Sequence, residues 1–411
     1  MARVYFDNNA TTPVLPEVFD AMRPYFGERF GNASSIHHHG QETRSAVERA
    51  RESVARLIGC RASEVVFASG GTESDNLAIF GVARAGDHVI TSTVEHHAVL
   101  NTCRHLGEKG CEVTYIPVDS SGRVDPADVR RALRPSTKLI SIMMANNETG
   151  AVQPVEEIGK IAAQADAYFH TDAVQAAGKI PVVVDEIGCD LLTISAHKLH
   201  GPQGVGALYV RKGTELQAQV HGGRHERSRR AGTENVPGIV GLGKAAELAL
   251  AGLERGDHLK MAELRDRLER GLMGIEACFA NGVDALPLQS TQRMGRPAIL
   301  KADHPRVPNT TNICFDGIDG EALVIALDLK GLAVSTGAAC SSGAIEPSHV
   351  LLAMGRTPEQ ARASIRFSLG KQNTAEDVDF AVGLVRKAVG RLRELSPVWK
   401  GLRASSHELR A

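Results

Sequence analysis

The chain has 411 residues, with 43% hydrophobic and 23% charged residues and a formal net charge of −1. A chain of this length is expected to form two domains rather than one small core. The balanced charge provides no overall field that would attract nucleic acid or an anionic membrane, so neither is an expected partner. The seven cysteines are scattered without CxxC spacing, which argues against a disulfide framework or a structural zinc site and indicates a reducing compartment, the cytoplasm.

The first predicted element is an amphipathic helix over residues 42–58, whose apolar residues recur on one face. From about residue 65 to 211, short apolar runs rich in β-branched residues alternate with helical patterns. The seven runs are 65–69, 88–94, 111–118, 138–145, 167–172, 190–196 and 206–211. They predict an α/β fold with a seven-stranded, mostly parallel sheet. Ligands bind such sheets beyond the carboxyl ends of the strands, so polar residues directly after a strand are the candidates for a site.

A long helical region is predicted over about 240–275. Its most apolar part, 238–253, contains Lys244 and Glu247 and stays short of the ~20 residues of a membrane span. The elements predicted after it are strands at 309–315, 332–335 and 364–369 and a last helix that Thr374 caps and that runs to about Leu395. The segment 284–308 has no clear period, and we interpret it as a long surface loop.

The first candidate site residues lie in "ASGGTESDN" (68–76), where a strand ends in two glycines and a helix begins. Gly71 allows the backbone to approach a ligand closely, Thr72 offers a hydroxyl, and a helix N-terminus attracts an anion. The pattern fits a phosphate-binding turn. Taken alone it is weak, because many strand–helix turns contain Gly-Gly-Thr.

Three further strand ends carry polar side chains. "VEHHAVL" places His96 after a strand, where a histidine is more often a helix cap or a packing residue than a catalyst. "NNETG" offers the amide of Asn147, which can donate a hydrogen bond to a ring substituent. "HTDAVQAAG" presents Asp172 and Gln175, and a helix cap is the simpler interpretation of Asp172 alone.

"SAHKLHGPQG" (195–204) carries Lys198 out of a buried strand. An amine at the edge of a sheet is partly desolvated, which lowers its pKa and favours the free amine that a Schiff base requires. An isolated lysine here would be interpreted as a surface residue. Together with a phosphate-binding turn, His96 and Asp172, however, Lys198 completes the set of groups that pyridoxal phosphate needs from a protein.

Two residues bear on the type of reaction. Cys340 stands among alanine, serine and glycine in "STGAACSSGAIEPSHVL" (335–351), so thiolate reactivity explains it better than packing, although a chance surface cysteine is the alternative. Arg366 lies between apolar residues in "SIRFSLG" (364–370). A guanidinium in a strand is suited to bidentate capture of a substrate carboxylate, and the alternative is an internal ion pair.

These blocks resemble the cysteine desulfurases of the NifS/IscS type, relatives of the class V aminotransferases with the PLP type I fold. The resemblance runs from "VYFDNNATTPV" (4–14) to "SIRFSLG" and includes "SGGTESDN", "EHHAVL", "NNETGAVQP", "SAHKLHGPQGVGALYVR" and "HGGRHERSRRAGTEN". It implies conversion of L-cysteine to L-alanine, with the sulfur passing to Cys340 as a persulfide and then to an iron–sulfur scaffold or another acceptor protein. It also implies a homodimer, a large domain over 15–260, and a small α/β domain made of 1–14 and 261–411.

The resemblance further implies a role for each matching residue. Lys198 would bind the cofactor covalently, His96 would stack on its ring and act as acid or base, and Arg366 would bind the substrate carboxylate. The implied phosphate contacts are Gly71, Thr72, Ser195 and His197, with Thr233 reaching the phosphate of the neighbouring subunit. The implied ring contacts are Asp172 at the pyridine nitrogen and Gln175 and Asn147 near the ring hydroxyl or the substrate.

Other functions stay open at this point. A selenocysteine lyase or a class V aminotransferase would use the same cofactor, and the aminotransferase would not need Cys340. A sulfur-relay or assembly component would keep the fold without catalysis. The histidines of "HHHG" (37–40) allow metal binding, but a solvated helix start explains them better, and we expect no metal site.

Overall fold

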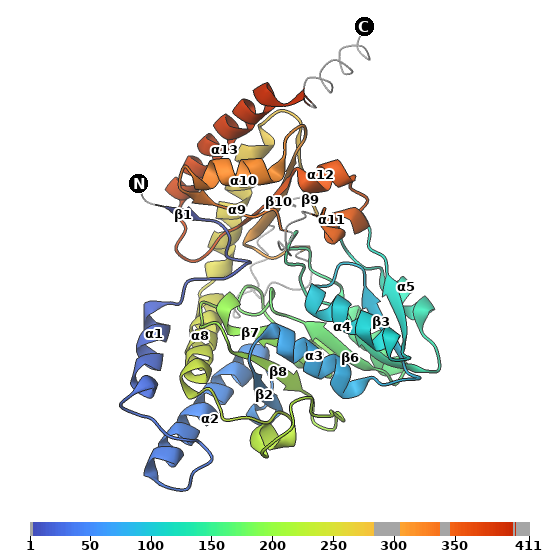
Figure 1. Ribbon diagram of the computed structural model, residues 1–411, viewed down its shortest axis with the longest axis vertical. Coiled ribbons are helices and arrows are strands. Elements are labelled where there is room, and N and C mark those ends of the chain that lie inside the picture. Colours follow the sequence, from blue (N-terminus) through green and yellow to red (C-terminus); the bar gives the residue numbers. More distant parts are fainter. Residues whose placement is uncertain (1–2, 283–304, 338–345, 398, 400–411) are drawn as a thin grey trace, which may run out of the picture.

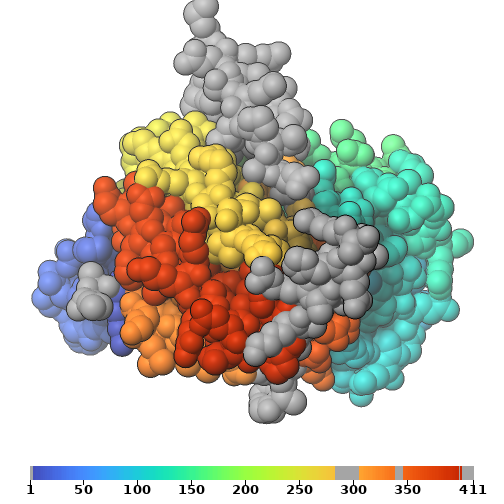
Figure 2. All heavy atoms as spheres, turned by 90° about the horizontal axis from the view of Figure 1, so that it is seen from above, coloured from blue at the N-terminus to red at the C-terminus, as the bar shows by residue number. Residues whose placement is uncertain are grey.

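The computed structural model describes residues 3–282, 305–337, 346–397 and 399. It has a larger layer built on one sheet and, above it in Figure 1, a smaller layer that contains both the first strand and the last long helix. Seen from above, the residues coloured yellow to red spread over the middle of the molecule, between blue residues on one side and cyan residues on the other (Figure 2). The smaller layer therefore sits on top of the larger one.

All seven predicted strands form the large sheet, in the order β2-β8-β7-β6-β5-β3-β4. Their bounds are β2 Val65–Ala68, β3 His88–Ser92, β4 Glu112–Ile116, β5 Thr137–Ser141, β6 Tyr168–Asp172, β7 Leu191–Ser195 and β8 Gly206–Val210. β8 runs antiparallel to its neighbours β7 and β2, and the other pairings are parallel. The predicted seven-stranded, mostly parallel sheet is confirmed.

Helices cover both faces of this sheet because neighbouring strand residues point to opposite sides. In β2, Val65 and Phe67 pack in the cluster that includes α2 and α8, whereas Val66 packs with α3 and α4. The helix bounds are α1 Pro16–Met22, α2 His38–Ile58, α3 Gly71–Val82, α4 His97–Glu108, α5 Pro126–Ala132, α6 Val155–Gln164, α7 Val184–Ile187, α8 Val236–Glu254 and α9 Asp257–Met273. The helix predicted over 42–58 is confirmed and begins earlier, because the His37 side chain accepts a hydrogen bond from the Gly40 N–H and caps α2.

Within the described residues, α8 is the helix that is long and apolar enough to cross a membrane, with a mean hydropathy of 1.4. Of the apolar 18-residue stretch of this helix, 56% is buried inside the protein. Gly243 lies so close to α2 that a Cβ atom there would stand 2.5 Å from the Cα atom of Ala50. The length and hydropathy of α8 are those of a core helix packed against α2.

The smaller layer contains an antiparallel sheet in the order β12-β10-β9 and a parallel pair, β1 and β11. Its strands are β1 Val4–Tyr5, β9 Cys278–Asn281, β10 Thr310–Phe315, β11 Leu332–Ala333 and β12 Ser364–Ser368, and its helices are α10 Gly320–Asp328, α11 His349–Ala353, α12 Pro358–Arg362 and α13 Ala375–Leu395. The strands predicted at 309–315, 332–335 and 364–369 are confirmed, and so is the Thr374 cap, which accepts from the Asp377 N–H at 3.3 Å.

The smaller layer has its own hydrophobic cluster, in which Val4 and Phe6 pack with residues of α9, α10 and α13. The beginning of the chain thus belongs to the same core as its C-terminal part. The domain boundaries at 14/15 and 260/261 stay a prediction.

The interpretation of 284–308 as a surface loop is wrong at its C-terminal end; residues 284–304 lie outside the described part of the chain. Arg306 is buried, and its Nη1 lies 2.6 Å from Oε2 of Glu269 in α9. Val307 is also buried, and its N–H donates to the Gly150 carbonyl at 2.8 Å. A basic residue in a segment without periodicity predicts a solvent-exposed loop. The local sequence does not show that a distant helix supplies the carboxylate that allows Arg306 to be buried.

Candidate active site

The carboxyl ends of the parallel strands bring the predicted site residues to one edge of the large sheet, beneath the smaller layer (Figure 1). Asp172 ends β6 and pairs in register with Thr193 of β7. Ser195 ends β7 and pairs with Gly206, which also pairs with Ala68 at the end of β2. Side chains that are far apart in the sequence are therefore neighbours in the structure.

The turn between β2 and α3 is packed too closely for side chains. A Cβ atom on Gly206 would stand 2.8 Å from the Cα atom of Gly70, and one on Gly71 would stand 3.1 Å from Cγ2 of Val174 and 3.8 Å from Cβ of Ser195. α3 begins at Gly71, so its free N–H groups lie beside Ser195. Thr72 is exposed at this helix start. The turn has the geometry of a phosphate-binding site, in which backbone amides and hydroxyls surround an anion.

Lys198 follows β7 in a short 3-10 helix, Ala196–Lys198. Its Nζ donates to the carbonyl oxygens of Asn9 at 2.5 Å and Ala10 at 2.6 Å. Burial lowers the pKa of Lys198 to about 8, and the positive charge of Arg366 adds to the effect. About a tenth of this amine is therefore unprotonated at pH 7, far more than for an ordinary lysine, and the free amine is the form that a nucleophile or base requires.

Asp172 is buried at the end of β6, and its Oδ1 accepts from the Val174 N–H at 2.9 Å. Burial raises the pKa of Asp172 to about 6, while the charge of Lys198 opposes this shift. Asp75 of α3 is a second buried acid that the sequence analysis missed. Burial and the charge of Asp172 raise the pKa of Asp75. Its Oδ1 lies 3.6 Å from Nε2 of His170, whose pKa burial lowers to about 3.

His96 caps α4, since its Nδ1 accepts from the Ala98 N–H at 3.1 Å. The cap interpretation is thus correct for one ring nitrogen. Burial lowers the pKa of His96 to about 4, and the nearby charge of Lys198 adds to the effect. The ring is neutral at physiological pH, which leaves it free to stack on an aromatic group and to exchange a proton.

Arg366 is buried in β12 and forms the internal ion pair that the sequence analysis had left open. Its Nη2 donates to Oδ1 of Asp7 at 2.7 Å, and its Nη1 donates to the Asn147 carbonyl at 3.1 Å. The Nε–H of Arg366 is buried and has no hydrogen-bond partner among the described residues. A buried, unpaired N–H on a guanidinium is costly unless a ligand completes it, so this edge of Arg366 is a binding position for an anion.

The connector of residues 6–12, between β1 and α1, supplies contacts that the sequence analysis did not assign. Asp7 pairs with Arg366, and the Asn9 carbonyl accepts from Gln175 Nε2 at 3.0 Å as well as from Lys198. Thr11 Oγ1 lies 3.1 Å from Nδ1 of His197. Asparagine, aspartate and threonine in a row are typical of turns, so only the tertiary structure shows that they surround the amine.

Two predicted site residues are not placed at this cluster. Thr233 is exposed, on the loop between a short 3-10 helix, His225–Ser228, and α8. Cys340 lies outside the described residues. In the basic stretch 224–230 before Thr233, Arg230 is paired with a carboxylate of the same chain: its Nε donates to Glu73 Oε1 at 2.8 Å.

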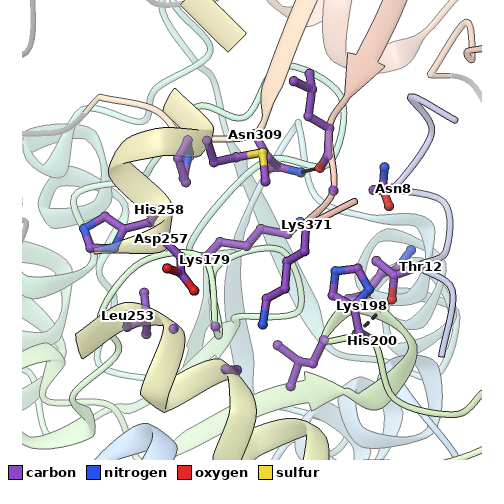
Figure 3. Close-up of a pocket in the computed structure, with 18 residues that line it drawn as sticks. Asn8, Thr12, Lys179, Lys198, His200, Leu253, Asp257, His258, Asn309 and Lys371 are labelled. Carbon is purple, nitrogen blue, oxygen red and sulfur yellow. Dashed lines mark hydrogen bonds between the residues drawn. The ribbon is translucent and has the colours of Figure 1, made fainter. Parts of the chain in front are cut away.

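A cavity of about 70 Å³ lies beside Lys198, lined by the connector, α8, α9 and the residues that follow β12. Lys179, Lys198 and Lys371 come together around it, with Thr12 and His200 beside Lys198 (Figure 3). Burial lowers the pKa of Lys179 well below the ordinary value. The site therefore contains a second amine that its surroundings favour in the neutral form.

No group of three or more metal-ligating side chains is placed to hold an ion in the described part of the chain. The only predicted candidate for metal binding, the histidines at 37–40, lies at the start of α2, where His37 serves as the cap.

The chain matches the family description "Aminotransferase class-V" over residues 4–380. It is 50% identical to "Cysteine desulfurase IscS" of Dictyoglomus turgidum, covering 97% of this chain and 98% of the relative. It is 50% identical to "Cysteine desulfurase IscS" of Methanosarcina thermophila, covering 96% and 94%. The solved structure of a "NifS-like protein" superposes with a TM-score of 0.84 at 38% identity, covering 95% of this chain and all of the other.

Proposed function

We propose that Lys198 and Cys340 carry out the desulfuration in this chain, which belongs to the class V aminotransferase family and is a cysteine desulfurase of the IscS/NifS type. The enzyme acts on cysteine with pyridoxal phosphate as cofactor. The observation that supports the assignment of Lys198 is its desolvated amine at the sheet edge, between the charges of Asp172 and Arg366.

The residues at the sheet edge fit pyridoxal phosphate. Gly71, Thr72, Ser195 and His197 are proposed to hold the phosphate, because the turn before α3 leaves room only for backbone and small groups there. Thr233 is proposed to reach the phosphate of a neighbouring subunit, since it is exposed on its own chain. When bound, the cofactor stores the electron pair that is released at the substrate Cα.

Asp172 and His96 suit the two parts of such a ring system. With a pKa of about 6, Asp172 is mostly ionised at neutral pH and can pair with a protonated ring nitrogen. His96 is neutral and can stack on the ring. Gln175 is proposed to contact the ring hydroxyl.

The substrate carboxylate is proposed to bind Arg366, and Asn147 to contact it or the ring. The unpaired Nε–H of Arg366 supports this position, because a carboxylate there would satisfy a buried donor. With the substrate held there, the amine of Lys198 would remove the Cα proton, and its pKa of about 8 suits that task near neutral pH.

Cys340 is proposed to accept the sulfur, leaving L-alanine. Burial raises the pKa of each of the six cysteines that the structure describes, for example Cys60 and Cys103 to about 12, so none of these is a ready thiolate. The residues on either side of 338–345 form hydrogen bonds with residues at or next to the site. The Ser335 carbonyl accepts from the Arg366 N–H at 2.7 Å, and Ser348 Oγ donates to Glu148 Oε2 at 2.6 Å.

The persulfide sulfur is proposed to pass to an iron–sulfur scaffold or another acceptor protein, and the enzyme to work as a homodimer in the cytoplasm. The scattered cysteines support a reducing compartment, and the exposed Thr233 supports a site that a second subunit completes.

The test is incubation of the protein and pyridoxal phosphate with L-cysteine, with alanine and sulfide measured over time. Cys340→Ser is expected to abolish alanine formation, whereas the matched control Cys60→Ser is expected to keep it. Full consumption of amino acid by Cys340→Ser would favour an aminotransferase instead.

The attachment site is tested separately, by borohydride reduction and peptide mapping. The pyridoxyl group is expected on Lys198 and not on Lys179 or Lys371, the two neighbouring lysines whose pKa values burial also lowers. A protein that develops no absorbance near ~420 nm with the cofactor would favour a non-catalytic assembly component.

A further inference from the structure

We propose that Asn9 is a positioning residue: it fixes the amine of Lys198 and the amide of Gln175 relative to the strands of the smaller layer. This inference rests on the proposed function, because it assigns the geometry of the same site. Asn9 itself is not proposed to touch the reacting atoms.

The side chain of Asn9 uses its full hydrogen-bonding capacity. The residue is 1% exposed. Its Oδ1 accepts from Lys179 Nζ at 3.1 Å and from Asn309 Nδ2 at 3.0 Å. Its Nδ2 donates to the Asn147 carbonyl at 3.1 Å and to Thr310 Oγ1 at 2.8 Å. Two accepted and two donated hydrogen bonds are all that an amide can make, so the side chain has one defined orientation.

The main chain of Asn9 connects the same two layers. Its N–H donates to Ser368 Oγ at 2.9 Å, in the strand that carries Arg366. Its carbonyl accepts from Lys198 Nζ at 2.5 Å and from Gln175 Nε2 at 3.0 Å. One residue thus joins the amine to the strand that holds the proposed carboxylate receptor.

Lys179, in the turn that follows β6, adds to this arrangement. Besides Asn9 Oδ1, its Nζ donates to Gln175 Oε1 at 2.5 Å. Because Lys179 occupies the oxygen of Gln175, the Nε2 of that amide is the end directed at the Asn9 carbonyl. Lys179 and Asn309 both line the cavity beside Lys198 (Figure 3).

Removing the Asn9 side chain is expected to leave a folded protein, because each of its four partners keeps another hydrogen bond. Lys179 keeps Gln175, Asn309 keeps the Leu369 carbonyl, Thr310 keeps Asn309, and the Asn147 carbonyl keeps Arg366. The isosteric Asn9→Asp replaces the Nδ2 donor by an oxygen that faces the Asn147 carbonyl, which repels it. The two variants therefore disturb position without opening a large cavity.

The experiment compares Asn9→Ala and Asn9→Asp with Asn281→Ala. Asn281 of β9 is the matched control: it is also 1% exposed, but its amide donates to Asn312 and Ser364 and to none of Lys198, Gln175 or Asn147. We expect kcat for alanine formation to fall at least about tenfold in both Asn9 variants and to stay within about twofold in Asn281→Ala. Thermal unfolding of all three verifies that they fold.

A second readout does not depend on catalysis. The rate at which a small acylating reagent modifies Lys198 in the cofactor-free full chain is followed against pH by mass spectrometry. The midpoint is expected to fall in Asn9→Ala, because the two carbonyls that stabilise the protonated amine are no longer held in place, and to be unchanged in Asn281→Ala.

A wild-type midpoint and kcat in Asn9→Ala, or equal losses in Asn281→Ala, would overturn the inference. A wild-type protein that makes no alanine from cysteine would instead contradict the proposed function, and the acylation midpoints would still decide the role of Asn9.

Discussion

Replacing Arg366 by lysine tests the carboxylate-binding position. The guanidinium donates a hydrogen bond to Asp7 through Nη2 and to the Asn147 carbonyl through Nη1. Its Nε–H has no acceptor among the described residues. A lysine amine near Asp7 keeps the positive charge but lacks the planar set of donors that can serve Asp7 and a substrate carboxylate together. Arg366→Lys should therefore lose about one charge-assisted hydrogen bond to the substrate.

Such a bond contributes about 1.5–3 kcal/mol, which corresponds to a decrease in kcat/KM of about 10- to 150-fold. The assay is initial-rate alanine formation over a range of L-cysteine concentrations. Cysteamine, which lacks the carboxylate, is the control ligand. Its affinity, followed by the change in cofactor absorbance, should differ by less than about threefold between the two proteins, since it forms no bond with Arg366. An unchanged kcat/KM, or an equal loss of affinity for both ligands, would refute the assignment.

Three other predictions follow from the described contacts. The rate of cofactor attachment to the apoprotein should rise between pH 7 and 9 with a midpoint near 8, because Lys198 must lose its proton to react and burial lowers its pKa to about 8; stopped-flow absorbance measures this. Glu226→Gln should lower the free energy of unfolding by up to about 3–5 kcal/mol in urea titrations, because it leaves the buried charge of Arg51, 2.6 Å away, with only the half-exposed Glu48 as a charged partner. Gly206→Ala should weaken cofactor binding at least about tenfold in equilibrium titrations, since its Cβ would stand 2.8 Å from Gly70.

Matched controls exist for the last two. Arg267 and Asp379 form an exposed ion pair at 2.6 Å, so Arg267→Ala should cost less than about 1 kcal/mol in the same titration. Gly383 lies in α13, where an added Cβ atom would have nothing within 4 Å, so Gly383→Ala should leave cofactor binding unchanged and stabilise the helix slightly. A Lys198 midpoint near that of an ordinary lysine, or equal effects in test and control variants, would contradict the respective prediction.

The large sheet could be predicted because its signals are local. Each strand is a short β-branched run, and a parallel sheet gathers whatever follows the carboxyl ends, which is why Asp172 and Lys198 were expected together. The roles of Asn9 and Lys179 could not be predicted in the same way. Their partners, such as Asn309 and Ser368, lie far away along the chain, and no local pattern distinguishes them from a turn former and a surface lysine.

Arg306 illustrates the same limit from the other side. A basic residue in a segment without periodicity indicates a solvent-exposed position. Arg306 is nevertheless buried, because it forms ion pairs with Glu269 and Asp266 of α9. A charged side chain can be buried when a distant element places an oppositely charged partner beside it. The composition of the local segment does not show whether such a partner exists. The pairing of Arg366 with Asp7 depends likewise on the chain's first and last strands lying in one layer.

That shared layer has a consequence for biosynthesis. Residues 4–9 emerge from the ribosome before the strands of the large sheet, but Phe6 and Asn8 exchange backbone hydrogen bonds with Ser368. The strands of the large sheet can pair while the chain is still being made, whereas the earliest residues must wait for nearly the whole chain before they find their place. The enclosure around the Lys198 amine is thus among the last parts to form, so any activity that depends on this enclosure begins only when translation of the described residues is almost complete.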